Sequence, residues 1–212
     1  MNFKYYKSHR LILFIIGLSI VVGSFVTLWI HPAIEKTPEP IRTLIIYLEL
    51  FTVPFFILLI FLYIDQWGWK TKCFKWLVDL PNLNGRYRGK LVSSFKVDNK
   101  NVEIECAVEI KQTASEITIS AYYFNAIKNE YSKSDSVIEL IEKQRNGSFL
   151  IYYVYTNTPG TLHPSLNIHE GTTVCTYYPD KKMLVGEYYN SRPNTGRFEV
   201  QFKSDKLIYR FE

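Results

Sequence analysis

Two apolar runs near the N-terminus are separated by a short polar break. Positions 11–30 hold no formal charge, and a second apolar run covers positions 44–64. A helix rises about 1.5 Å per residue, so about twenty residues cross a hydrocarbon core of roughly 30 Å. The pattern therefore predicts two transmembrane helices, Leu11–Ile30 and Leu44–Ile64, which form an anchor within residues 1–64.

After residue 64 the hydrophobicity alternates with a period of two. The alternation is clearest in Val102–Lys111, which is typical of a half-buried strand. Turn signals separate eight or nine such runs, over 86–94, 102–111, 116–125, 136–143, 148–156, 172–178, 183–190, 197–203 and a short 207–211. We expect residues 85–212 to form an all-β domain, an antiparallel up-and-down, lipocalin-like β-barrel of about eight strands. A two-sheet sandwich is the alternative, and it would lack a ligand-sized mouth.

Basic residues flank the outer ends of both predicted helices. They are Lys4, Lys7, Arg10, Lys70, Lys72 and Lys75, whereas the intervening loop 31–42 has a net charge of zero. The positive-inside rule then predicts a multi-pass protein with both termini in the cytoplasm. From residue 79 onward there are 17 basic and 16 acidic residues. Such a near-neutral domain argues against DNA or RNA as a partner.

Three residues are candidates for contact with the lipid bilayer. Trp67 and Trp69 alternate with lysines in the linker 65–84, a composition suited to an anionic membrane interface. Glu49 is the one formal charge inside the second predicted helix. Two interpretations of Glu49 stay open: its carboxylate reaches the nearer interface, or it pairs across an oligomer.

Catalytic motifs are missing from the sequence. There is no phosphate-binding loop, zinc-protease motif, nucleophile elbow or closely spaced cysteine pair. His163, His169 and Glu170 are better explained as solvated loop residues than as metal ligands. We expect the three cysteines to be free, buried thiols, as is usual in a reducing compartment. The protein is therefore expected not to be an enzyme and to need no cofactor.

The remaining chemistry is aromatic and basic. Twelve of the 16 tyrosines follow residue 79, several as neighbouring pairs such as Tyr188-Tyr189. Since successive strand residues point to opposite faces, each pair sends one ring inward, where it can stack on a base. Arg192 and Arg197 bracket the turn 191–196, and guanidinium groups suit phosphate.

The order of parts, two N-terminal spans followed by a β-rich domain that opens on Gly85-Arg86-Tyr87-Arg88-Gly89, resembles the two-transmembrane, β-strand-rich effectors of CBASS anti-phage systems, the CD-NTase-associated protein fifteen family. The Gly-x-aromatic-x-Gly opening is also similar to the first strand of lipocalin-type barrels, where Trp usually stands at the position of Tyr87. That second likeness implies that Tyr87 closes the barrel floor against a cation such as Arg210.

The first resemblance implies an effector in the bacterial inner membrane. Its cytosolic barrel would bind a cyclic dinucleotide made by a CD-NTase, and binding would promote homo-oligomerisation, membrane disruption and cell death or growth arrest. We expect the ligand to be bound by Arg192, Arg197, Tyr87, Tyr153, Tyr155, Tyr189, Asn190 and Ser94. The alternatives are a membrane-tethered binder of an apolar ligand and a protein-interaction scaffold.

Overall fold

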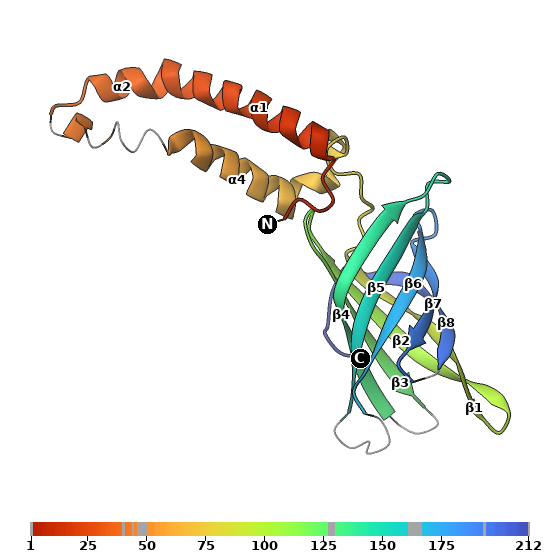
Figure 1. The fold of residues 1–212 in the computed structure, drawn as a ribbon. Coiled ribbons are helices and arrows are strands. Elements are labelled where there is room, and N and C mark those ends of the chain that lie inside the picture. The colour runs from red at the N-terminus through yellow and green to blue at the C-terminus, as the bar shows by residue number, and fades with distance from the viewer. Residues whose placement is uncertain are drawn as a thin grey trace. The chain divides into compact units, whose positions relative to one another are not determined.

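The chain folds into two compact units. The computed structural model describes residues 2–39, 41–43, 45, 51–126, 130–160, 167–192 and 194–211. The first unit comprises residues 1–80 with the turn 113–116, and the second comprises residues 81–112 and 117–212. Helices make up most of the first unit, and strands make up the second (Figure 1).

A continuous N-terminal helix dominates the first unit. It consists of α1 (Ser8–Phe25), a π-helical turn (Val26–Ile30) and α2 (His31–Glu35), 28 residues in all. At about 1.5 Å per residue it is long and apolar enough to span a membrane. The predicted loop 31–42 is wrong for its first five residues, because the helix continues to Glu35. The π-helical turn accommodates Pro32, which lacks the N–H of a regular helix.

The second predicted span is described only in part. Helix α4 (Thr52–Gln66) has 15 residues, or about 22 Å, which is short of a hydrocarbon core. Position 44 and positions 46–50, with Glu49 among them, lie outside the described residues. Of the described helices, one has the length of a membrane span.

Helices α1 and α4 run side by side and share a core with the segment that follows them (Figure 1). The Trp69 ring is 1% exposed there and packs with Tyr6 and Leu77, whereas Trp67 is 64% exposed. The Asp65 carboxylate, at the end of α4, accepts a hydrogen bond from the Ser115 hydroxyl. The predicted interfacial linker is thus folded, with Trp69 inside the protein core.

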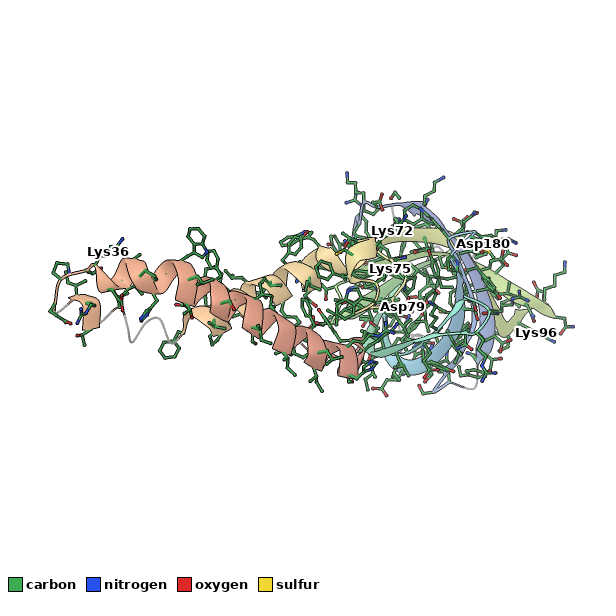
Figure 2. All side chains as sticks on the ribbon, turned by 90° about the horizontal axis from the view of Figure 1, so that it is seen from above. Lys36, Lys72, Lys75, Asp79, Lys96 and Asp180 are labelled. Atoms are coloured by element: carbon green, nitrogen blue, oxygen red, sulfur yellow. The ribbon has the colours of Figure 1, made fainter. Side chains whose placement is uncertain are left out.

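Charged side chains lie at both ends of this first unit. Lys72, Lys75 and Asp79 lie at one end, and Lys36 lies at the other (Figure 2). The Asp79 carboxylate is 3.4 Å from the Lys7 ammonium, so the start of the chain is held against the segment that follows α4. The long apolar stretch of α1 lies between these charged ends.

The second unit is a closed barrel in which each strand pairs antiparallel with the next and β8 returns to β1. This topology confirms the expected eight-stranded up-and-down barrel and excludes the sandwich. The strands are β1 (Gly85–Val97), β2 (Lys100–Gln112), β3 (Ile117–Asn125), β4 (Glu130–Lys143), β5 (Phe149–Pro159), β6 (His169–Tyr178), β7 (Met183–Asn190) and β8 (Thr195–Ser204).

The expected short ninth strand at 207–211 is wrong, because this segment forms an irregular tail. Strand β1 already pairs with β2 and β8, so its hydrogen-bonding edges are occupied. The buried Arg86 guanidinium instead donates to the backbone carbonyls of Arg210 and Phe211. Its ion-pair partner Glu109 accepts hydrogen bonds from the backbone N–H groups of Ile208 and Tyr209. The buried pair thus fixes the tail on the outer wall.

Candidate ligand site

Inward-facing side chains leave a cavity of about 150 Å³ at one end of the barrel, called here the mouth. This end of the barrel carries the turn between β7 and β8, and β1 begins at the opposite end. Alternating positions on seven strands and one turn residue line it, namely Leu91, Ile104, Tyr123, Ser132, Ser134, Tyr155, Asn157, His169, Tyr188, Asn190 and Arg192. The mouth is therefore polar and aromatic, unlike the aliphatic interior expected for an apolar-ligand carrier.

One backbone carbonyl orients the two basic groups of the mouth. The Arg192 guanidinium donates to the carbonyl oxygen of Asn167 at 2.7 Å. The Nδ1 atom of His169 lies 3.2 Å from the same oxygen, which can only accept, so Nδ1 carries the hydrogen. Burial lowers the pKa of His169, and the positive charge of Arg192 acts in the same direction. The rim of the mouth thus presents a fixed cation beside a neutral imidazole.

The tyrosines of the mouth remain protonated donors. Burial raises the pKa of the phenols of Tyr123, Tyr155 and Tyr188. The Tyr188 hydroxyl donates to the Ser93 hydroxyl at 3.1 Å, which fixes its ring. The Tyr155 ring packs against the Tyr153 ring on the same strand, with 6.2 Å between the ring centroids. The site therefore offers rigid aromatic faces and neutral hydroxyls.

The eight predicted ligand residues lie in the mouth, in the barrel interior below it, or on the outer wall. Arg192, Tyr155 and Asn190 line the mouth together. Tyr153 lies beneath Tyr155, and Tyr87 lies at the floor, where its hydroxyl donates to the Leu83 carbonyl and its ring meets Phe202 edge-on. The other three, Ser94, Tyr189 and Arg197, line an outer depression of about 940 Å³ on the β1–β8–β7 wall.

Several mouth residues were not predicted. Asn157, Ser134 and His169 face the cavity, as do Tyr123 and Tyr188. Their position in the alternation was the available signal, because Asn157 shares the parity of Tyr153 and Tyr155 on one strand. Among the described residues no group of three or more His, Cys, Asp or Glu side chains could hold a metal ion, and His163 lies outside them.

Comparison with known proteins identifies the domain. The family model described as Cap15, cyclic dinucleotide receptor domain, matches residues 78–201, more than half of the chain. A search of the curated proteins found no match. The matched segment includes every residue that lines the mouth. The matching family model describes a receptor domain and not a known enzyme family.

Proposed function

Because the chain belongs to the Cap15 family of CBASS effectors, we propose that its barrel mouth binds the cyclic dinucleotide and that binding activates a membrane anchor. The observation that supports this site is the combination of Arg192 with the Tyr155 ring in one cavity of the matched domain. A guanidinium can bind phosphate through charge-assisted hydrogen bonds, and a base stacked on an aromatic ring gains about 1–3 kcal/mol. Neither role requires catalysis or a cofactor.

The site is tested by comparing two arginine variants. We expect Arg192→Ala to weaken cyclic dinucleotide binding by roughly tenfold to a hundredfold, because a hydrogen bond to a charged group contributes about 1.5–3 kcal/mol. Arg197→Ala is the matched variant, because Arg197 lies in the outer depression. Calorimetry on the full chain in detergent measures both. Loss of binding in Arg197→Ala alone would contradict the site in the mouth and would indicate that the ligand binds in the outer depression.

We also propose a two-pass anchor in the bacterial inner membrane with both termini in the cytoplasm. The helix Ser8–Glu35 supplies one pass. Helix α4 and the apolar residues before it, 44–64 in the sequence, supply the second. Lysines near residues 4–10 and 70–75 support the orientation. Trp67 remains a candidate interfacial residue because its ring is exposed. Both interpretations of Glu49 remain: its carboxylate reaches the nearer interface, or it pairs across an oligomer.

Activation is proposed to be a shift in population toward a homo-oligomer that disrupts the bilayer. A ligand can shift this equilibrium only if it binds the oligomer-competent state more tightly. We expect a cyclic dinucleotide to increase both crosslinked oligomers and dye release when the full chain is reconstituted in liposomes. A linear dinucleotide of the same bases is the control. Ligand binding without either change would contradict the proposed activation.

A further inference from the structure

Two buried carboxamide oxygens in the mouth have no hydrogen-bond partner among the described residues. They are the Oδ1 atoms of Asn157 and Asn190. Asn157 is 5% exposed, and its carboxamide nitrogen donates to the Ser134 hydroxyl at 2.9 Å, which fixes the orientation of the amide. A buried acceptor without a donor has lost its hydrogen bonds to water without gaining one in return. A ligand that supplies two donors would restore these hydrogen bonds, displacing any water that serves the oxygens in the free protein.

The two amides stand on either side of one aromatic face. Asn157 lies on β5 and Asn190 on β7, and strand β6 runs between them. The inward position of β6 opposite Asn190 is Gly171, where a Cβ atom would collide with the Tyr155 ring. The glycine therefore lets Tyr155 lie over β6 between the amides. A planar group stacked on this ring would lie between the two strands that carry the acceptors.

The size of the cavity limits what can enter it. Complete small-molecule sites usually enclose about 300–1,000 Å³, whereas the mouth encloses about 150 Å³. One nucleobase fits such a space better than a whole cyclic dinucleotide. The sugar and phosphates would then remain at the rim, where Arg192 lies.

The two unpartnered oxygens can distinguish the bases by the number of hydrogen-bond donors that each base offers. Guanine has two neighbouring donor nitrogens, N1–H and the 2-amino group, whereas adenine, cytosine and uracil each have one donor nitrogen on the pairing edge. We propose, on the basis of the ligand site proposed above, that Asn157 and Asn190 bind the N–H edge of a guanine base inserted into the mouth. This assigns base specificity to the two amides and phosphate binding to the rim.

The test compares bases in the wild-type chain. Calorimetry on the full chain in detergent would use cyclic dinucleotides of guanine, hypoxanthine, adenine and uracil, each in the 3′,3′ and 2′,3′ linkages. We expect the guanine ligand to bind at least tenfold more tightly than the hypoxanthine ligand, which lacks only the 2-amino group. Equal binding of these two, or a preference for adenine or uracil, would overturn the base assignment alone. Failure of every ligand to bind would overturn the ligand site itself.

Variants then assign the preference to the two amides. One of the variants Asn157→Ala and Asn190→Ala, the one that removes the acceptor of the 2-amino group, should reduce the guanine-over-hypoxanthine ratio to about threefold or less. The other removes the acceptor of N1–H, which both bases carry, and should weaken both ligands alike. Asn82→Ala is the matched control, because Asn82 is exposed and precedes β1 at the floor end. Thermal unfolding confirms that each variant is folded. An unchanged ratio in both mouth variants would overturn the assignment, and the wild-type comparison stands even if a variant fails to fold.

Discussion

We expect His169 to make the stability of the barrel depend on pH. Burial lowers its pKa below the ordinary value of 6.5, and Arg192 adds to this effect, although the Asn167 carbonyl opposes it. As the pH falls through about 6.5, the unfolded chain therefore takes up the proton more readily than the folded chain, and folding stability is lost. Between pH 7.5 and 5.5, the urea midpoint should fall more in wild type than in His169→Gln. Parallel changes in both proteins would contradict this.

Residue-level prediction succeeded where alternation decides the outcome. Each neighbouring tyrosine pair was expected to send one ring inward, and Tyr153, Tyr177 and Tyr188 are buried while their partners are more exposed. Arg192 and Arg197 could not be separated in this way. Arg197 lies on β8, where it alternates with the buried Phe198 and therefore faces the outer wall. Arg192 lies in the turn, where no strand period applies, and the turn brings it to the mouth.

At the scale of the element, the β1–β8 pairing that closes the barrel depends on Gly89. A Cβ atom there would collide with the Glu199 carbonyl and lie 2.8 Å from the Val200 Cα atom, so the two strands could not keep their spacing. We expect Gly89→Ala to destabilise the barrel by roughly 1–3 kcal/mol or more, as overpacking does. Lys90→Ala, on the exposed face of the same strand, should change little. Urea unfolding compares the two, and similar midpoints would disprove the role of Gly89.

The positions of the strands were largely predictable because their alternation and turn residues agree. The β4 strand begins earlier than expected, at Glu130, because serines and charges at its start hide the period. The tail after β8 resembles a strand in composition. It is irregular because barrel closure, a long-range pairing, occupies both edges of β1. The helix past Ile30 was missed because Pro32 is tolerated by a local π-helical turn.

At the scale of the whole molecule, one cysteine can report the orientation of the protein in the membrane. The expectation of three buried thiols holds for Cys106 and Cys175 but is wrong for Cys73, which is exposed in the segment after α4. Burial raises the pKa of both buried thiols to about 12, so they react slowly. An impermeant maleimide should label inverted inner-membrane vesicles and not spheroplasts, with Cys73→Ser as the control. The opposite labelling would place this segment outside the cytoplasm.

Closure of the barrel also limits how copies of the protein can associate. Where the described strands overlap, each has a neighbour on both sides, so the closed part of the ring offers no sheet edge to a strand from a second copy. Overhanging strand ends are the exception: residues 138–143 of β4 pair with β5, whereas the pairing of β4 with β3 ends at Asp135. Growth of a shared sheet between copies would therefore require one ring to open or such an overhang to take up the second strand. We expect intact barrels to associate through side chains of the outer walls or through the apolar helices, so an infrared spectrum should show no gain of intermolecular β-structure when copies assemble.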